Sequence, residues 1–269
     1  MAQSLQHYRF DNAGIGFVPT MGALHQGHIS LVEQCRCEND ISVVSIFVNP
    51  TQFNDRNDLA NYPRTMDEDL EKLSSAGCDF VFAPSVEEMY PEEDTRVFDF
   101  GMLDKVMEGA HRPGHFNGVA QIVSKLFDAV QPDRAYFGEK DFQQLAIIRR
   151  LMVMMNSGIK IMGCSIVREA DGLAMSSRNV RLMPEERKNA PAIFRILSAC
   201  GKKIKTMPLD DLKKWVVEQI NNTPCLQTEY FDIVDRNTLQ TAVQYRENAL
   251  QGCIAVQAGT VRLIDNIRL

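Results

Sequence analysis

Residues Pro19–His28 read PTMGALHQGH, and this stretch decides the expected fold. It follows the apolar run Ile15–Val18 and precedes a segment, Ile29–Cys35, with apolar residues at helical spacing. A strand, a glycine-containing turn and a helix in this order point free backbone N–H groups at an anion. His25 and His28 stand at or just before the start of the helix. The stretch therefore predicts a phosphate-binding turn.

The composition is that of an ordinary globular protein. Of the 269 residues, 45% are apolar and 24% are charged, enough for one large domain or two smaller ones. The net charge of −6 argues against nucleic acid as the main ligand, because binding its phosphates needs a basic surface. The sequence shows no signal region and no run of membrane-spanning length, and its seven cysteines form no CxxC pair. We therefore expect a cytoplasmic protein with no membrane partner.

Strands and helices alternate along the first part of the chain. The predicted strands are Ile15–Val18, Ile41–Val48, Asp79–Ala83, Ala135–Gly138 and Ile159–Val167. The predicted helices are His28–Cys37, Asp67–Ala76 with Asp67 as its cap, Leu103–Gly109, Val119–Val130 and Asp141–Asn156. Asp55–Tyr62 and Arg112–Phe116 are predicted loops, and Val97–Phe100 is a predicted edge strand. This alternation predicts an α/β fold, a Rossmann-like parallel sheet with helices on both faces.

The pattern changes after about Gly172. Two helices and then three strands are expected, over Pro184–Cys200, Leu209–Asn222, Tyr230–Val234, Cys253–Gln257 and Val261–Ile264. Blocks of this kind predict a smaller α+β domain. We place the domain division between residues 167 and 168, giving a nucleotide- and substrate-binding domain over 1–167 and a C-terminal lid domain over 168–269.

Polar clusters follow nearly every predicted strand of the parallel sheet. Besides the PTMG turn, they are Asn49–Gln52, Pro84–Ser85, Gly138–Asp141 and Arg168–Gly172. Ligands of open parallel sheets bind outside the carboxyl ends of the strands, so these clusters predict one site. Lys140 is a natural point-charge partner for a phosphate, and Ser176–Arg178 offers two hydroxyls and a guanidinium.

Several common site types are excluded or left open. No GxxxxGK[ST] and no GxGxxG is present, which excludes the usual P-loop and dinucleotide fingerprints. A zinc site of His25, His28, Cys35 and Cys37 is disfavoured, because residues two apart on a helix point in nearly opposite directions. Gln52 and Gln144 are uncharged amides that either hold a hydroxy acid or are ordinary surface glutamines.

Further motifs follow Pro19–His28 in the chain. They are SIFVNPTQF at 45–53, YPRT at 62–65, RPGHF at 112–116, FGEKDFQQL at 137–145, DGLAMSSRN at 171–179 and LIDN at 263–266. Together these motifs resemble the pantoate–β-alanine ligase family, and PTMGALHQGH resembles its form of the HIGH signature of nucleotidylyltransferases. The resemblance runs from about Gly16 to the end. Gln121 stands where threonine is common in that family, Ser165-Ile166 replace Pro-Thr, and the segment before Gly16 is short.

The resemblance implies an ATP-dependent ligation of (R)-pantoate and β-alanine to pantothenate. The reaction passes through pantoyl adenylate and releases AMP and pyrophosphate, with Mg²⁺ accompanying ATP. His28, His25, Lys140 and Arg178 would be the catalytic residues. Gln52 and Gln144 would hold pantoate, with Gln52 also near β-alanine, and Glu68 and Asp69 are candidate Mg²⁺ ligands. The implied ATP contacts are Met21, Gly22, Ala23, Leu24, His25, Gln26, Gly27, His28, Gly138, Glu139, Lys140, Asp141, Val167, Met175, Ser176, Ser177 and Arg178.

The resemblance also implies a homodimer formed through the nucleotide-binding domain. Two rival functions stay open from the sequence. One is a nucleotidyltransferase acting on a phosphorylated acceptor, and the other is a nucleotide-binding module without catalysis. A zinc-binding structural protein is a more distant third.

Overall fold

The structure is a computed structural model that describes residues 1–54 and 56–269. By its contacts the chain forms two compact units. The first unit consists of Met1–Phe100, Arg112–Glu139 and Gln144–Ser165. The second unit consists of Gly101–His111, Lys140–Gln143 and Ile166–Leu269. The division predicted from sequence, between residues 167 and 168, assigns the two short segments of the second unit to the first domain instead.

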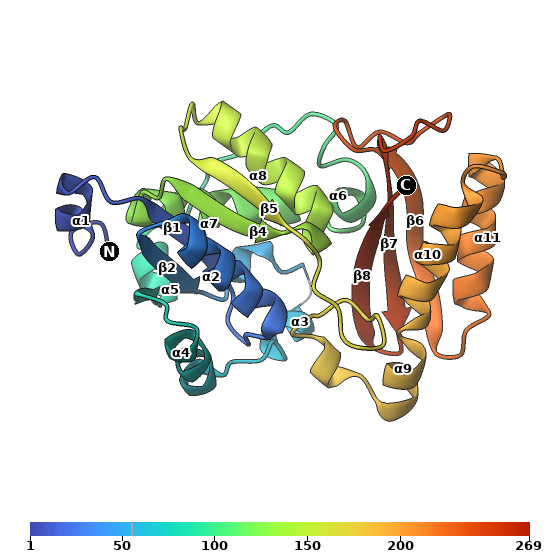
Figure 1. Cartoon of the computed structure of the whole chain (residues 1–269), viewed down its shortest axis with the longest axis horizontal. Coiled ribbons are helices and arrows are strands. Elements are labelled where there is room, and N and C mark those ends of the chain that lie inside the picture. The colour runs from blue at the N-terminus through green and yellow to red at the C-terminus, as the bar shows by residue number, and fades with distance from the viewer. Residues whose placement is uncertain (55) are drawn as a thin grey trace. The chain divides into compact units, whose positions relative to one another are not determined.

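The first unit is built on a parallel sheet with strand order β3-β2-β1-β4-β5 (Figure 1). Its strands are β1 (Ile15–Thr20), β2 (Ile41–Ile46), β3 (Phe80–Phe82), β4 (Arg134–Gly138) and β5 (Lys160–Cys164). Every residue of β2 is buried, as its β-branched run predicts for a strand covered on both faces. The predicted Rossmann-like fold is confirmed.

Four main helices cover this sheet. They are α2 (Gln26–Glu38), α4 (Met66–Ser75), α7 (His115–Val130) and α8 (Phe142–Met154). The chain adds β2 and β3 on one side of β1 and then adds β4 and β5 on the other side. Because the crossovers are right-handed, α2 and α4 lie on one face of the sheet and α7 and α8 lie on the other (Figure 1). Shorter elements lie between them, namely α1 (Gln6–Phe10), the 3₁₀ turn η1 (Pro50–Gln52), α3 (Arg56–Ala60) and α5 (Val86–Met89).

Three local predictions in this unit are wrong. Residues 56–60 of the predicted Asp55–Tyr62 loop form α3, and Asp55 lies outside the described residues. Helix α4 begins at Met66 with Thr65 as its N-cap, so Asp67 lies inside the first turn. Val97–Phe100 pairs with no strand of the described chain, because side chains of α7 take the place of a partner strand.

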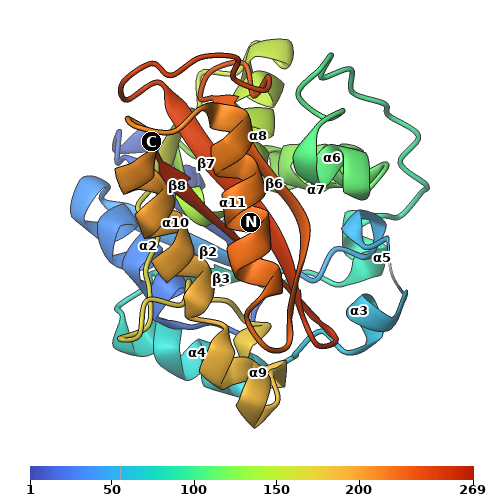
Figure 2. The ribbon, with the colours of Figure 1, turned by 90° about the vertical axis from the view of Figure 1, so that its right-hand side faces the viewer.

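The second unit contains an antiparallel sheet of order β6-β7-β8. Its strands are β6 (Leu226–Asp235), β7 (Leu250–Ala258) and β8 (Val261–Arg268), and α10 (Ala192–Lys203) and α11 (Leu209–Asn221) pack on one face (Figure 2). The smaller elements are α6 (Met107–His111), η3 (Asn179–Arg181) and α9 (Pro184–Asn189), while the 3₁₀ turn η2 (Glu139–Asp141) spans the boundary between units. The predicted β7–β8 hairpin is confirmed.

The predicted helix Pro184–Cys200 is two helices in the structure. Helix α9 ends at Asn189 and α10 begins at Ala192, with Pro191 as its N-cap residue. Proline has no N–H to continue the hydrogen-bond ladder of a helix, so an interruption of the helix at this point is expected.

Gly101–His111 joins the second unit through charged contacts. Glu108 receives two hydrogen bonds from the Arg262 guanidinium, at 2.8 and 2.7 Å, and one from the Tyr230 hydroxyl at 2.8 Å. Gln143 adds a further tie, because its Oε1 accepts from the Glu108 N–H at 3.0 Å. The contacts of Glu108 with Tyr230 and Arg262 join residues more than a hundred positions apart, so local sequence patterns do not reveal them.

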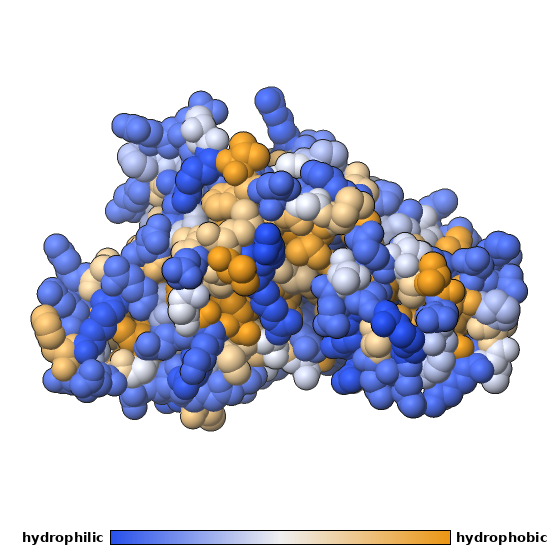
Figure 3. Space-filling model, turned by 90° about the horizontal axis from the view of Figure 1, so that it is seen from above, coloured by the Kyte–Doolittle hydropathy of each residue, from blue (hydrophilic) through white to orange (hydrophobic). Residues whose placement is uncertain are grey.

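No helix of the described chain is long and apolar enough to cross a membrane. On the face drawn in Figure 3, apolar residues form patches between polar ones. A few large apolar side chains of the first unit are strongly exposed, among them Phe10, Val97 and Val153.

Candidate active site

The Pro19–His28 turn lies at the carboxyl end of β1 and leads into α2. Gly22 and Ala23 both have positive φ, +77° and +49°, which turns the chain sharply after the strand. His25 is the N-cap of α2, and its Nδ1 accepts a hydrogen bond from the Gly27 N–H at 3.1 Å. His28 Nδ1 accepts in turn from the His25 N–H at 3.3 Å. The two histidines thus form a reciprocal capping box at the start of the helix.

The capping box decides which ring nitrogen carries the proton in each neutral histidine. Because Nδ1 acts as an acceptor in both rings, the hydrogen of each neutral imidazole resides on Nε2. The two rings lie beside one another, with centroids 4.0 Å apart. His25 and His28 therefore each carry the ring hydrogen on Nε2, next to the positive end of the α2 dipole. This arrangement suits a polyphosphate.

Asp69 of α4 holds this turn in place. Its carboxylate accepts hydrogen bonds from the Ala23 N–H at 2.8 Å and the Leu24 N–H at 2.7 Å, and also from the Thr65 hydroxyl at 3.2 Å. The residue is fully buried. Lys72 adds a contact from the same helix, donating to the Leu24 carbonyl at 2.9 Å.

The geometry shows Asp69, a candidate Mg²⁺ ligand from the sequence, as an acceptor for backbone amides. Both of its carboxylate oxygens are occupied by protein donors. Glu68 lies exposed, 3.9 Å from Lys72. In the described part of the chain no group of three or more His, Cys, Asp or Glu side chains is placed to hold a metal ion.

Gln52 lies at the end of η1, beside the turn. Its Nε2 is 2.8 Å from Met21 Sδ, and its Oε1 accepts from Asn49 Nδ2 at 3.4 Å. Its backbone carbonyl accepts from His115 Nδ1 at 2.8 Å and from Arg112 at 3.3 Å. The structure therefore brings the predicted residues Met21 and Gln52 together.

Asn49, Arg112 and His115 were not selected from the sequence as individual site residues. Asn49 is only 1% exposed, and Arg112 also contacts His115 Nε2, at 3.2 Å. Two of them belong to the RPGHF motif, which was predicted as a loop and whose last two residues begin α7 in the structure. The RPGHF motif was the only signal in the sequence for Arg112 and His115. Their hydrogen bonds to the Gln52 carbonyl show how these two residues support the site.

The neighbouring glutamines of α8 differ sharply in their surroundings. Gln143 is buried and donates to the carbonyls of Leu103 at 2.7 Å and Val106 at 2.9 Å. Gln144 is half-buried, and within residues 1–54 and 56–269 its amide makes no hydrogen bond. Of the pair, Gln143 is therefore the amide committed to protein carbonyls, and the ligand role of Gln144 stays a prediction.

Lys140, Asp141, Val167 and Met175–Arg178 belong to the second unit. Lys140 Nζ is 3.6 Å from the Asp141 carboxylate, and the Lys140 carbonyl accepts from Asn266 at 2.9 Å. The Val167 carbonyl accepts from the Met175 N–H at 3.0 Å, and the Ser176 hydroxyl accepts from the Arg178 N–H at 3.3 Å. The polar residues between Val167 and Arg178 are thus held in a compact loop.

Arg168 anchors that loop to β8. Its guanidinium donates to both Asp265 carboxylate oxygens, at 2.6 and 2.9 Å, and lies 3.7 Å from the centre of the Phe194 ring. Arg168 also forms a β-bridge with Ala174. The bidentate ion pair and the aromatic ring together fix the Arg168 side chain, and this holds the backbone of the loop at Arg168.

The family match comes from the whole chain. A family model described as pantoate-beta-alanine ligase matches residues 1–268. The chain belongs to the pantoate–β-alanine ligase family. It is therefore an enzyme of that family, and the resemblance seen in the motifs is confirmed.

Curated relatives and solved structures agree with this assignment. The pantothenate synthetase of Bacteroides thetaiotaomicron is 59% identical over 255 residues, covering 94% of this chain and 90% of the relative. That of Porphyromonas gingivalis is 56% identical over 263 residues, covering 97% and 94%. The crystal structure of the Thermus thermophilus pantothenate synthetase aligns with a TM-score of 0.91, at 46% identity over 95% of this chain and 93% of that one.

One solved relative carries ligands. The Francisella tularensis pantoate-beta-alanine ligase, complexed with beta-gamma ATP and beta-alanine, aligns with a TM-score of 0.82 at 35% identity. The match covers 98% of this chain and 93% of that chain. For a pantoate–β-alanine ligase, the turn at Pro19–His28 and the amides at Gln52 and Gln144 are the parts whose roles require explanation.

Proposed function

We propose that this chain joins (R)-pantoate to β-alanine at the expense of ATP, through a pantoyl-adenylate intermediate. A pantoate carboxylate oxygen attacks the α-phosphorus of ATP, and the bond from that phosphorus to the bridging oxygen of pyrophosphate breaks. The β-alanine amine then attacks the acyl carbon of the adenylate, and AMP departs as the new C–N bond forms and the amine loses a proton. The products are pantothenate, AMP and pyrophosphate.

The observation that carries this proposal is the paired histidine cap on α2. The two imidazoles cap the first turn of α2, at the positive end of the helix dipole, which favours a bound anion. Charge accumulates on the α-phosphate and on the departing pyrophosphate in the first step, so donors fixed beforehand stabilise that transition state. We assign His28 as the principal catalytic donor and His25 as its partner.

Lys140 and Arg178 supply the remaining positive charge in this proposal. They neutralise the leaving pyrophosphate, while the other proposed ATP contacts are Met21–His28, Gly138–Asp141, Val167 and Met175–Ser177. No protein nucleophile is required, because the substrate carboxylate and amine are themselves the nucleophiles. Catalysis then rests on positioning and charge stabilisation.

Gln52 and Gln144 are assigned to pantoate. Their amide N–H groups can donate to its carboxylate and hydroxyl oxygens, and an uncharged donor does not quench the nucleophilic carboxylate as a cation would. Gln52 is also assigned a contact with β-alanine. The absence of protein hydrogen bonds to the Gln144 amide, in the part of the chain that is described, supports this assignment.

Mg²⁺ enters the proposal as part of the substrate Mg·ATP. Magnesium in such sites usually keeps several waters and binds phosphate oxygens with few protein ligands.

We also infer that the chain acts as a homodimer in the cytoplasm. Val97 is 86% exposed, and its backbone groups have no hydrogen-bond partner in the described chain, which leaves an open edge that a second copy can pair with about a two-fold axis. All seven cysteines are free thiols, as expected in a reducing compartment. Light scattering of the wild type and of Val97→Asp tests the dimer, which the variant should weaken.

Pyrophosphate exchange into ATP is the decisive test of function. The proposal requires exchange that depends on pantoate and proceeds without β-alanine. Exchange that needs a phosphorylated acceptor instead would establish a nucleotidyltransferase of another specificity. ATP binding without AMP formation, in the presence of both substrates, would establish a non-catalytic module.

A further inference from the structure

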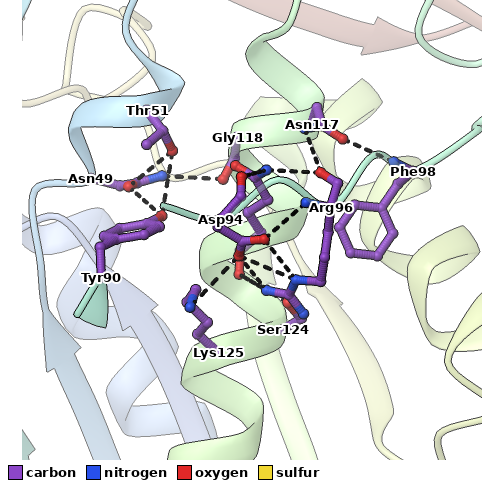
Figure 4. Close-up of polar contacts among 11 residues, drawn as sticks. Asn49, Thr51, Tyr90, Asp94, Arg96, Phe98, Asn117, Gly118, Ser124 and Lys125 are labelled. Carbon is purple, nitrogen blue, oxygen red and sulfur yellow. Dashed lines mark hydrogen bonds and ion pairs between the residues drawn. The ribbon is translucent and has the colours of Figure 1, made fainter. Parts of the chain in front are cut away.

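Residues 90–98, here called the strap, lie along α7 in the first unit (Figure 4). The Gln121 side chain holds the backbone of the strap, because its Nε2 donates to the carbonyls of Asp94 and Arg96, both at 2.8 Å. Asn117 donates to the same Arg96 carbonyl at 3.1 Å. Gln121 is only 6% exposed, so its amide is a buried tie between α7 and the strap.

Charged side chains fasten the same segment. The Arg96 guanidinium donates to both Asp94 carboxylate oxygens, at 2.8 and 2.6 Å, and Lys125 of α7 lies 3.6 Å from that carboxylate. Hydrogen bonds from Arg96 lower the pKa of Asp94 to about 2, so the carboxylate is charged at neutral pH. The strap is therefore tied to α7 by both amide and ionic contacts.

The strap begins with Tyr90, whose hydroxyl reaches Asn49, the N-cap residue of η1. It donates to Asn49 Oδ1 at 2.8 Å, and Thr51 donates to the same oxygen at 3.2 Å (Figure 4). Lys125 Nζ lies 5.1 Å from the centre of the Tyr90 ring. Burial raises the pKa of Tyr90, so the hydroxyl keeps its hydrogen and remains a donor.

The Asn49 amide has only one orientation that satisfies its neighbours. Its Nδ2 faces the Gly118 carbonyl at 3.1 Å, and a carbonyl can only accept, so the oxygen must face Tyr90. The second Nδ2 hydrogen points to Gln52 Oε1, at 3.4 Å. The Gln52 amide is thereby oriented with its oxygen toward Asn49 and its NH₂ group away from it.

The Gln52 NH₂ group keeps its capacity as a donor. Its only hydrogen bond among the described residues is to Met21 Sδ, and a thioether is a weak acceptor. A carboxylate or hydroxyl oxygen of a substrate would be a much stronger partner for these hydrogens. The orientation of Gln52 is thus the one that an anionic hydroxy acid needs.

We propose that Tyr90 is a positioning residue for substrate binding, acting through Asn49 to orient the Gln52 amide, and that Gln121 secures it by holding the strap on α7. The proposal rests on the assignment of Gln52 to pantoate made above. Tyr90 itself touches neither substrate nor nucleotide in this scheme.

Tyr90→Phe tests the relay, because it removes one hydroxyl and keeps the ring. A hydrogen bond contributes about 0.5–1.5 kcal/mol, which corresponds to about a 2- to 12-fold rise in the KM for pantoate. We expect the KM for ATP to stay within about twofold, since the turn at Pro19–His28 is held by other contacts. Tyr8→Phe is the matched control, because the Tyr8 hydroxyl has no hydrogen bond in the described residues.

A second readout does not depend on turnover. The side-chain amide signal of Gln52, assigned by its loss in Gln52→Leu, should shift in Tyr90→Phe and stay in place in Tyr8→Phe. Gln121→Met removes both amide donors at similar length and should produce a shift of the same kind, together with a higher KM for pantoate.

Two results would overturn the relay. One is an unchanged pantoate KM with an unshifted Gln52 signal in Tyr90→Phe. The other is an equal loss for pantoate and ATP together with a lower melting temperature, which indicates a purely structural role. If the wild type lacks pantoate-dependent exchange, the proposed function fails, and the Gln52 signal alone then decides whether Tyr90 orients that amide.

Discussion

Asp69 and Leu24 are 45 positions apart in the chain, and the Leu24 N–H donates a 2.7 Å hydrogen bond to the Asp69 carboxylate. The other oxygen of the same carboxylate accepts from Ala23 at 2.8 Å. A fully buried carboxylate on α4 therefore sets the path of the backbone that leads to His25. This relationship makes α4 part of the machinery that shapes the proposed nucleotide site.

Asp69→Asn should damage the turn although its size is almost unchanged. An amide presents only one acceptor oxygen, so one of the two backbone N–H groups is left buried without a partner, which costs about 1–3 kcal/mol. We expect a lower free energy of unfolding in urea and a rise of about tenfold or more in the KM for ATP. Asp67→Asn, at an exposed position of the same helix, is the control. An unchanged KM for ATP in Asp69→Asn would refute this role.

Gly22→Ala should strain the same turn from the other side. Gly22 has φ +77°, and a Cβ there would lie 3.0 Å from both an Asp69 carboxylate oxygen and Ile46 Cγ2. A left-handed backbone costs a residue with a side chain about 1–2 kcal/mol, and the close contacts add to it. Thermal unfolding should show a loss of about 1–3 kcal/mol. Gly158→Ala, where a Cβ meets nothing within 4 Å, should change stability little. Equal effects of the two substitutions would contradict the prediction.

His28→Ala and Lys140→Ala should each slow the adenylation step. Loss of one preorganised donor to developing charge typically lowers the rate about 100- to 1,000-fold. The measurement is pantoate-dependent pyrophosphate exchange at saturating substrates, with circular dichroism to check that each variant is folded. His7→Ala and Lys202→Ala, both at exposed positions, are the matched controls. Turnover near that of the wild type would remove the substituted residue from the mechanism.

Asp94 should make the stability of the first unit depend on pH in acid. Hydrogen bonds from Arg96 lower its pKa from 3.8 to about 2 in the folded chain. A lowered pKa means that the stabilisation is complete above about pH 4 and is lost as the pH falls through about 2. Urea unfolding should therefore separate the wild type from Asp94→Asn by about 1–2 kcal/mol at pH 6. That difference should shrink toward pH 2, whereas Asp11→Asn, at an exposed position, should show little difference at any pH. A gap that is constant from pH 6 to pH 2 would contradict the account.

The sequence by itself determined the sheet, its helices and the place of the turn. These features follow from local periodicity, because a buried parallel strand such as β2 is a continuous β-branched run and an amphipathic helix such as α7 repeats every 3.6 residues. The motif order was enough to identify the family. Boundaries and short elements, such as α3 and the break at Pro191, were less well predicted, because packing and single residues decide them.

Only the tertiary structure decided how the site residues are held. Asp69 was a candidate Mg²⁺ ligand from the sequence, and only the fold shows that its oxygens accept from the Ala23 and Leu24 amides. Gln144 was named from the sequence, and only the fold shows that its neighbour Gln143 is bound to protein carbonyls. Gly101–His111 reads as part of the first domain but packs with the second unit through Glu108 and Arg262. Each of these outcomes depends on hydrogen bonds between residues far apart in the chain, and such bonds leave no periodic signal. The Pro19–His28 turn itself was visible in the sequence, whereas the carboxylate that shapes it was visible only in the fold.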